Sequence, residues 1–353
     1  MFLNIFYEKT VMARFYGFTK KQILDVYRNM ILSRSLDMRM LTLLKQGKSF
    51  FHMGCSGHEA AQLAASAVFK SGEDWFFPYY RDLAFCIGIG MTARDHMLGS
   101  LARAEDPSSG GRQLPHHYGQ KKLRIVSQSS STGTQFLQAV GCALARKLDK
   151  TKEIVYVSAG EGTTSQGDFH EALNWSSRAK APIIFHIQDN EYAISTHKSE
   201  QTGGSISALA SGYENLYRYE VDGTNYFETN LAFKQASQRA RKGRGPSLVV
   251  SNVVRLLPHS SSDDHRKYRS NKDLEQDKKR DPLVIMEEYC IKNKIINKKK
   301  SDELLANINK SVDSDAQWAE LQEHPDPDSA LYHLYSAENN LVETKKNIIE
   351  DNV

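Results

Sequence analysis

Cysteine is scarce in this sequence. Four cysteines occur in 353 residues, and they lie far apart: Cys55, Cys86, Cys142 and Cys290. No two of them form a C-x-x-C pair or part of a paired framework, which excludes a disulfide-rich scaffold and a structural zinc site. Scattered cysteines are typical of proteins in reducing compartments, so we expect a cytoplasmic protein.

Long apolar runs are also missing. No stretch of about 18 apolar residues occurs, and a membrane span is therefore excluded. The short apolar patch at the N-terminus is broken by Glu8, which makes it a poor signal peptide.

The net charge is small, at +4, and the excess of basic residues is confined to one segment. Between residues 265 and 300 there are twelve Lys and Arg against six Asp and Glu, whereas the remaining sequence has 34 basic and 36 acidic residues. A near-neutral body argues against a nucleic-acid-binding protein. We interpret the basic segment as a solvated helix face or, alternatively, as a contact for the acidic surface of a partner domain.

The apolar pattern alternates between strand and helix periods, which predicts an α/β protein. Two short runs, 154–157 and 182–187, are apolar on both faces as buried parallel strands are, and the segment 165–180 between them predicts a crossover helix. The same sheet is extended by a strand, a helix and a strand at 217–221, 226–241 and 247–254. We therefore expect a doubly wound, mostly parallel sheet.

Helical segments flank this sheet region in the sequence. They are predicted at 19–44, 58–69, 81–100, 134–148, 281–296 and 301–321. The polar, glycine-bearing stretch 105–122 is expected to be an ordered active-site loop or a lid. This organisation predicts an N-terminal extension (1–17), an α/β cofactor domain (18–275), a C-terminal helical segment (276–325) and a partly disordered polar tail (326–353).

Polar residues follow both strands of the predicted βαβ unit. Glu161 stands between two glycines after the first strand, and Asn190 follows the second. Ligands of open parallel sheets bind outside the carboxyl ends of the strands, so both groups are expected to face one crevice. A carboxylate, an amide and a nearby carbonyl suit Mg²⁺, and the glycines let the backbone approach a diphosphate. The other interpretation is two ordinary strand-end loops, where Gly and Asn are common.

Several segments along the sequence, including this one, match the motifs of a known protein family. Gly160-Glu161-Gly162 followed by residues 190–195 resembles the thiamine-diphosphate motif of the 2-oxo acid dehydrogenase α subunits, and the resemblance extends from about residue 18 to 320. Further matching segments are 57–60, 80–82, 111–119 and 258–264. The Gly-Arg-Gln-x-Pro-x-His-Tyr and His-Ser-x-Ser-Asp-Asp segments are more similar to the branched-chain (2-oxoisovalerate) type than to the pyruvate type. The fold implied is the thiamine-diphosphate-binding type.

The resemblance implies a role for individual residues. Mg²⁺ is held by Glu161, the Asn190 side chain and the Tyr192 carbonyl. Thiamine diphosphate is contacted by Tyr80, Arg81, Ser130, Thr132, Gly162, Thr163, Gln188 and His259. A monovalent-cation site, usually for K⁺, maps to Ser129, Ser131, Thr134 and Gln135. His259 lies over the reacting carbon, where it stabilises or protonates species formed during decarboxylation and acyl transfer.

Two departures from the family pattern concern charge. Gln188 stands where branched-chain relatives often carry an arginine to the diphosphate. The loss of that charge is expected either to weaken cofactor binding or to shift the contact to Arg81 and a partner chain. Asp189 and Glu191 replace a neutral Asn and Gly, which adds negative charge beside the metal. A second cation or a nearby lysine is expected to offset that charge.

Some histidines and serines have a second interpretation. His259 alone would be a solvated loop histidine, and His117 is as consistent with a position near the substrate as with one away from it. Ser260 matches a regulatory phosphorylation position of mitochondrial relatives, but we favour the interpretation as a polar loop serine.

One catalytic group is missing from the chain. Thiamine catalysis needs a carboxylic acid against the aminopyrimidine, and the family pattern places it on a β subunit. The resemblance thus implies an α₂β₂ heterotetramer, with the lipoyl domain of the acyltransferase component and a branched 2-oxo acid as further partners.

Three alternatives stay open at this point. They are the same fold acting on pyruvate or acetoin, a nicotinamide oxidoreductase, and a non-catalytic scaffold. Against the second, the segment 159–165 lacks the G-x-G-x-x-G spacing.

Overall fold

The computed structural model describes residues 16–334, so most of the predicted N-terminal extension and the end of the predicted tail lie outside the described residues. At its centre is a five-stranded sheet of order β1-β2-β3-β7-β6 in which every pairing is parallel. The strands are β1 (Trp75–Phe77), β2 (Val155–Gly160), β3 (Ile183–Asp189), β6 (Tyr217–Asp222) and β7 (Ser247–Asn252). The predicted α/β fold with a mostly parallel sheet is confirmed.

Both faces of the sheet are covered by helices. Successive residues of a strand point to opposite faces, so Val155 packs with α5 (Thr134–Leu148) and α6 (Gly167–Ala179), whereas Tyr156 packs with α9 (Tyr226–Arg241). Helix α2 (Glu59–Ser66) lies against α9, where the Asn230 amide donates to the Ala64 carbonyl at 3.0 Å. Burial on both faces is the reason why β2 and β3 each begin with consecutive apolar residues.

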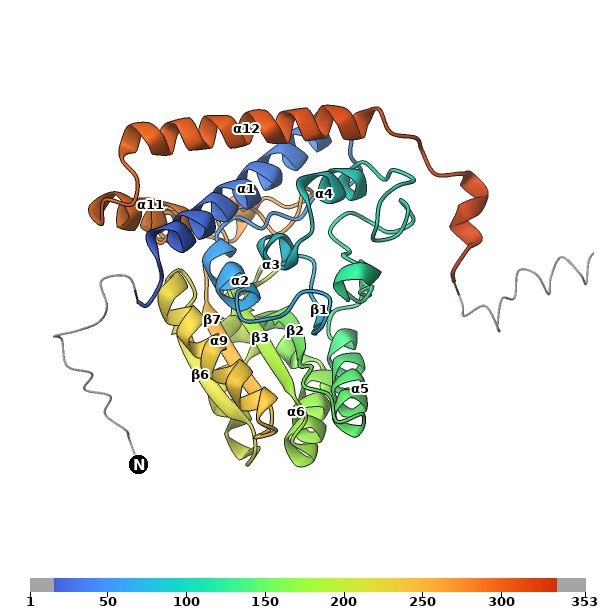
Figure 1. Ribbon diagram of the computed structural model, residues 1–353, viewed down its shortest axis with the longest axis vertical. Coiled ribbons are helices and arrows are strands. Elements are labelled where there is room, and N and C mark those ends of the chain that lie inside the picture. Colours follow the sequence, from blue (N-terminus) through green and yellow to red (C-terminus); the bar gives the residue numbers. More distant parts are fainter. Residues whose placement is uncertain (1–15, 335–353) are drawn as a thin grey trace, which may run out of the picture.

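A layer of helices from both ends of the described chain covers one side of this core. Helix α1 (Lys20–Lys45) begins with a capping box, in which Thr19 and Gln22 exchange side-chain and backbone hydrogen bonds. Helix α12 (Lys298–Glu320) runs along α1 at the top of Figure 1, with α11 (Pro282–Lys292) beside them. The Tyr27 hydroxyl lies 2.7 Å from Ser301 Oγ, which ties α1 to α12 inside a shared apolar cluster. The predicted domain boundaries stay predictions.

Some elements differ from the prediction. The segment 81–100 contains two helices, α3 (Leu83–Ile89) and α4 (Ala93–Ser100), because Gly90 has a φ of 123° and Thr92 caps the second helix. Among the described residues, the sequence analysis missed β1, the short hairpin of β4 (Tyr192–Ala193) and β5 (Thr196–His197), and eight short helical elements. Three are the helices α7 (Lys198–Gln201), α8 (Ile206–Leu209) and α10 (Asn271–Lys279), and five are 3₁₀ turns at Lys121–Leu123, Glu161–Ser165, Ala210–Gly212, His265–Lys267 and Pro327–Leu331.

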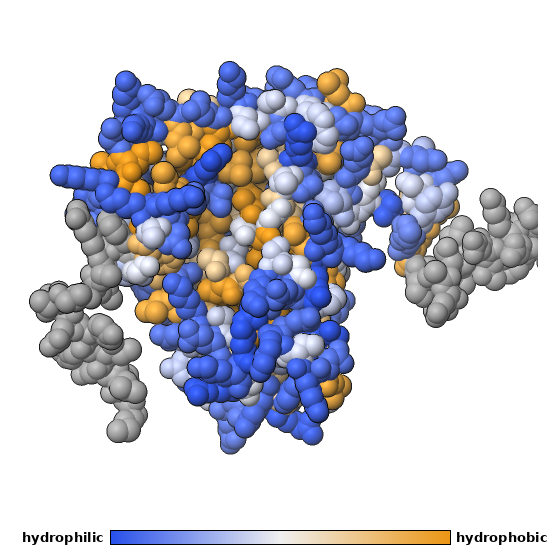
Figure 2. Space-filling model, in the orientation of Figure 1, coloured by the Kyte–Doolittle hydropathy of each residue, from blue (hydrophilic) through white to orange (hydrophobic). Residues whose placement is uncertain are grey.

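On the face seen in Figure 2, the surface is mostly polar over the sheet-containing half of the molecule. Figure 2 shows apolar side chains gathered around α1 and α11, and Val284 and Ile285 of α11 remain partly exposed. Within residues 16–334, no helix combines the length and the apolar composition that crossing a membrane requires.

Candidate cofactor site

A cavity of about 400 Å³ opens at the carboxyl ends of β2 and β3. Ten of the residues predicted for the site line it: Tyr80, Arg81, Ser130, Thr132, Glu161, Gly162, Thr163, Asn190, Tyr192 and His259. They come from five separate chain segments, which the parallel sheet brings to one edge. The stretch 105–122, predicted to be an active-site loop or a lid, contributes Leu114 and His117 to the same wall.

Glu161 and Asn190 meet at the floor of this cavity. Glu161 Oε2 accepts a hydrogen bond from the Asn190 backbone N–H at 3.2 Å, whereas Glu161 Oε1 is buried without a hydrogen-bond partner. Burial, and secondly the charge of Asp189, raise the pKa of Glu161 to about 7. A buried carboxylate oxygen without a partner is costly, and an oxygen-preferring cation such as Mg²⁺ would satisfy it. The residues present therefore fit such an ion.

The extra carboxylates beside this floor have a lysine partner. Lys198 Nζ lies 3.0 Å from Asp189 Oδ2 and 3.2 Å from Glu191 Oε1. Although burial acts the other way, these carboxylates raise the pKa of Lys198. A lysine that compensates the negative charge of Asp189 and Glu191, as the sequence analysis expected, is therefore present at the start of α7.

Arg81 and His259 form one unit in the cavity wall. The guanidinium of Arg81 is buried, donates to the Gly54 carbonyl, and places Nη2 3.0 Å from both Nδ1 and the carbonyl oxygen of His259. Burial, together with the charges of Arg81 and Arg255, lowers the pKa of His259 to about 3. A neutral His259 that accepts at Nδ1 carries its hydrogen on Nε2. The imidazole is a fixed, neutral donor in the cavity wall, and the prediction that it is a functional residue rather than a solvated loop histidine agrees with this placement.

The position after Glu161 requires glycine because it packs closely against Ala193. A Cβ atom added at Gly162 would lie 2.5 Å from the Ala193 Cβ, so no side chain fits there. Across the cavity, Ser130 Oγ lies 2.6 Å from His117 Nε2, which brings the second candidate histidine to the wall.

Gln188 is not part of the cavity wall, contrary to its predicted contact with the cofactor. Its side chain is fully buried, with the Oε1 atom accepting from Gln62 at 2.9 Å and the Nε2 atom donating to Asp82 at 2.6 Å. Both polar atoms of the Gln188 amide are therefore hydrogen-bonded within the protein, because the side chain points into the region between the sheet and α2.

The predicted monovalent-cation residues lie together at the start of α5 but do not line the cavity. Thr134 Oγ1 donates to the Ser131 carbonyl at 3.0 Å, and the Ser131 N–H donates to Ser129 Oγ at 3.1 Å. Gln135 is buried and donates to the Ser158 carbonyl at 3.1 Å. That site stays a prediction.

Arg255 is a wall-supporting residue that the sequence analysis missed. Its buried guanidinium donates to the Ile194 carbonyl at 3.0 Å and, more weakly, to the Tyr192 carbonyl at 3.4 Å. The Tyr192 oxygen keeps a second lone pair for a cation. The sequence offered a signal for this role, because Arg255 stands within the apolar run 253–257 that follows β7, and a charged residue in such a run requires a buried partner.

Comparisons with known proteins agree with this arrangement. The model of the dehydrogenase E1 component family matches residues 27–328. The chain is 41% identical over 325 residues to the 2-oxoisovalerate dehydrogenase subunit alpha of Bacillus subtilis (strain 168), an alignment that covers 91% of this chain and 97% of that protein. It is 30% identical over 318 residues to the pyruvate dehydrogenase E1 component subunit alpha of Staphylococcus aureus (strain Mu50), covering 90% and 83% respectively. The matched range includes the sheet and every cavity residue named above.

Proposed function

The chain belongs to the dehydrogenase E1 component family, and from that premise we propose that it is the α subunit of a thiamine-diphosphate-dependent dehydrogenase of branched-chain 2-oxo acids. The observation that carries the proposal is the joint placement of Glu161, Asn190, Arg81 and His259 around one cavity. The substrate class is supported by the identity of 41% to a 2-oxoisovalerate dehydrogenase subunit, against 30% to a pyruvate dehydrogenase subunit.

Mg²⁺ would be held by the Glu161 carboxylate, the Asn190 side chain and the Tyr192 carbonyl. The diphosphate would be met by Tyr80, Arg81 and the amides of Gly162 and Thr163, with Ser130 and Thr132 at the aminopyrimidine. Thiamine diphosphate, when bound, supplies the electron sink for decarboxylation of the 2-oxo acid. K⁺ at Ser129, Ser131, Thr134 and Gln135 is the further cation that this proposal includes.

His259 would act on the substrate from the wall. Its Nδ1 atom is occupied by Arg81, so the hydrogen on Nε2 is the one presented to the cavity. A neutral imidazole in this position donates a hydrogen bond to a developing oxyanion and gives up its proton at that atom. Arg81 fixes the ring orientation, and burial, together with the charges of Arg81 and Arg255, keeps the ring neutral.

A β subunit would complete the site. The rim of the cavity exposes Leu114 and Ile194, with relative exposures of 52% and 55%, and Phe51 beside them is half-buried. Exposed apolar side chains that gather at one opening are typical of an interface. The β subunit would supply the carboxylic acid for the aminopyrimidine, within an α₂β₂ assembly that passes its acyl group to the lipoyl domain of an acyltransferase. The four cysteines are free, which suits the reducing cytoplasm.

The test is turnover by the chain purified with its β subunit. We expect activity with 2-oxoisovalerate and 4-methyl-2-oxopentanoate that exceeds the activity with pyruvate or acetoin, and stabilisation against heat by Mg²⁺ with thiamine diphosphate but not by NAD. A preference for pyruvate would overturn the substrate class, and stabilisation by NAD alone would overturn the cofactor.

A matched pair of variants separates an enzyme from a scaffold. Glu161→Gln removes the proposed metal ligand and is expected to abolish turnover, whereas Glu171→Gln changes an exposed carboxylate on α6 and is expected to leave it intact. Full activity of Glu161→Gln would mean that the cavity has no catalytic role.

A further inference from the structure

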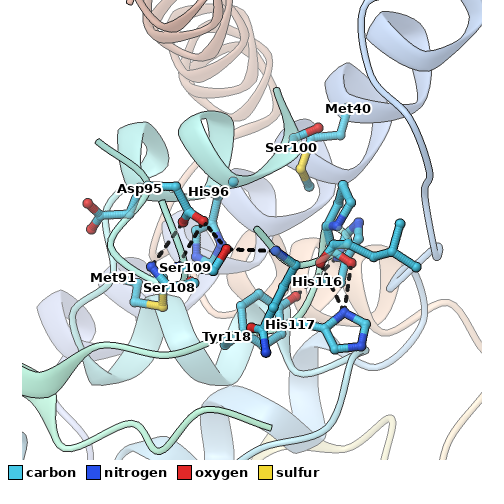
Figure 3. Close-up of a pocket in the computed structure, with 15 residues that line it drawn as sticks. Met40, Met91, Asp95, His96, Ser100, Ser108, Ser109, His116, His117 and Tyr118 are labelled. Carbon is cyan, nitrogen blue, oxygen red and sulfur yellow. Dashed lines mark hydrogen bonds between the residues drawn. The ribbon is translucent and has the colours of Figure 1, made fainter. Parts of the chain in front are cut away.

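A chain of buried polar groups lies behind the cavity wall. Nε2 of His52 lies 2.9 Å from Asp37 Oδ1, which is the distance of an ion pair, although the angle does not meet that of a hydrogen bond. The other ring nitrogen of His52, Nδ1, lies 3.1 Å from Nε2 of His116. Nδ1 of His116 is 3.2 Å from the Tyr118 hydroxyl, which lies 3.3 Å from the Tyr80 carbonyl. Figure 3 shows His116 and Tyr118 next to each other, beside a small cavity of about 20 Å³. The four side chains are all at least nine-tenths buried.

This chain joins segments that are far apart in the sequence and that all supply the cofactor cavity. His52 stands between Phe51 and Met53, and His116 stands next to His117, three residues that line the cavity. Tyr118 contacts the carbonyl of Tyr80, another wall residue. The backbone carbonyl of His52 also accepts from the Ser261 N–H at 2.9 Å, two residues after His259. Four parts of the wall therefore meet at one histidine pair.

The direction of the hydrogen bonds depends on one proton. When His52 carries two ring hydrogens, it donates to His116, His116 donates to Tyr118, and the Tyr118 hydroxyl donates to the Tyr80 carbonyl. When His52 carries one hydrogen, directed at Asp37, its Nδ1 becomes an acceptor and every later bond must reverse. The Tyr118 hydroxyl then donates to His116 instead, and the Tyr80 carbonyl loses its partner. The two acceptors lie at nearly equal distances from that hydroxyl, 3.2 and 3.3 Å.

We propose that His52 and His116 are positioning residues that use one shared proton to hold the Tyr80, 114–117 and 51–53 segments of the cavity wall together. With the proton present, the wall segments are linked to the Asp37 carboxylate in α1, and without it the link to the Tyr80 segment opens. The consequence for cofactor binding rests on the proposed function, whereas the ordering of the wall does not.

Surrounding charges support this assignment of the proton. The groups that face the pair are Asp37, His96, Tyr118 and Arg81. Although burial acts the other way, contacts from His52, Ser56 and the Cys55 N–H lower the pKa of Asp37 to about 2, so its carboxylate stays charged. Burial, and secondly the neighbouring His52, lower the pKa of His116 well below its ordinary value. The charged Asp37 carboxylate lies at the His52 end of the pair, 2.9 Å from its Nε2 atom, so this end is where the chain can stabilise an extra proton.

The test is hydrogen exchange of the complex with its β subunit, without cofactor, from about pH 5.5 to about pH 8.5, the range in which histidine side chains change charge in proteins. Rates are divided by the intrinsic rate at each pH, for peptides that contain residues 51–53 and 114–119. In the wild-type protein we expect protection to fall about two- to tenfold as pH rises, the change produced by loss of one buried hydrogen bond. The affinity for thiamine diphosphate with Mg²⁺ is expected to fall over the same interval by a similar factor.

Two variants and one control decide between a proton-dependent chain and ordinary packing. His52→Gln cannot take up the second proton, and Tyr118→Phe removes only the terminal hydroxyl, so both are expected to lose the pH transition in wall protection. His96→Gln is the control, since His96 is equally buried and contacts the Tyr118 ring at 5.6 Å, while its Nε2 atom has no hydrogen-bond partner. This variant is expected to keep the transition.

The outcomes separate the two proposals. Three results would overturn the positioning chain. The wild-type protein could lack the pH transition, Tyr118→Phe could keep it, or His96→Gln could lose it as well. If His52→Gln does not fold, Tyr118→Phe against His96→Gln gives the answer. If the wild-type protein shows the transition but does not bind thiamine diphosphate at any pH, the chain stands and the proposed function fails.

Discussion

Lys198 stands at the start of α7 between two carboxylates and the proposed metal site, and its replacement tests how the site balances charge. Its ammonium group is the ion-pair partner of Asp189 and Glu191, at 3.0 and 3.2 Å. Lys198→Met leaves both carboxylates without that partner and keeps a side chain of similar length. The local charge then becomes more negative by one unit.

The expected effects on two ligands have opposite signs. Unit charges about 8 Å apart in a medium of effective dielectric about 40 interact by about 1 kcal/mol, and the interaction is doubled for a divalent ion. Mg²⁺ alone should therefore bind Lys198→Met about five- to thirtyfold more tightly. The diphosphate is an anion, so with Mg²⁺ saturating, thiamine diphosphate should bind about five- to tenfold more weakly.

The same substitution also affects folding. The Lys198 side chain is 35% exposed and that of Asp189 is 7% exposed, so the pair lies between an exposed and a buried ion pair. Exposed pairs contribute at most about 1 kcal/mol, and breaking a buried pair costs about 3–5 kcal/mol. We expect the free energy of unfolding to fall by about 1–2 kcal/mol in urea titrations without ligand.

Isothermal titration calorimetry of the complex with its β subunit measures both affinities. The control is Lys242→Met, which removes an exposed lysine after α9 and should change neither affinity by more than about twofold, because exposed distant charges are screened. Affinities for Mg²⁺ and thiamine diphosphate that fall together would point to distortion of the site. No change in either would mean that Lys198 does not balance this charge, and the reasoning would be refuted.

Three further predictions concern buried groups. Burial raises the pKa of Asp82 to about 7, so the folded chain keeps a proton that the unfolded chain releases, and the free energy of unfolding should fall by about 1.4 kcal/mol per pH unit between about pH 4 and about pH 7. Asp82→Asn should remove that slope in urea titrations. Gly162→Ala should weaken cofactor binding at least about tenfold in calorimetry, because its Cβ would meet Ala193, whereas Gly141→Ala, with open space around it, should have no effect. Gln188→Leu should cost about 2–3 kcal/mol in unfolding free energy but change cofactor affinity less than about threefold; a larger change in affinity would show a direct contact.

Most of the fold was predictable because its signals are local. The strands β2, β3 and β7 are buried on both faces and therefore contain runs of consecutive apolar residues, and α9 spans the predicted residues 226–241. Strand β1 has only three residues, too few for a period, and its pairing with β2 depends on residues about 80 positions later. The break between α3 and α4 depends on the conformation of Gly90, which periodicity does not encode.

The site was predictable as far as strand order determines it. Glu161 and Asn190 follow adjacent parallel strands, and that order alone brings them together. Gln188 shows the limit, because a family resemblance gives a position in the chain but not the direction of the side chain. His52 and His116, 64 positions apart, have no sequence signal that pairs them, since loop paths alone bring them into contact.

The pairing of α1 with α12 bears on how the chain is made in a cell. Tyr27 and Ser301, which join the two helices, are 274 positions apart. At a synthesis rate of about 5–20 residues per second, about 15–50 seconds separate the emergence of the two helices from the ribosome. During that interval α1 can pack against α2, α3 and α4, which follow it closely, but the part of α1 that faces α12 lacks its final partner. The nascent chain therefore presents that apolar strip, a surface suited to chaperones, for most of its translation.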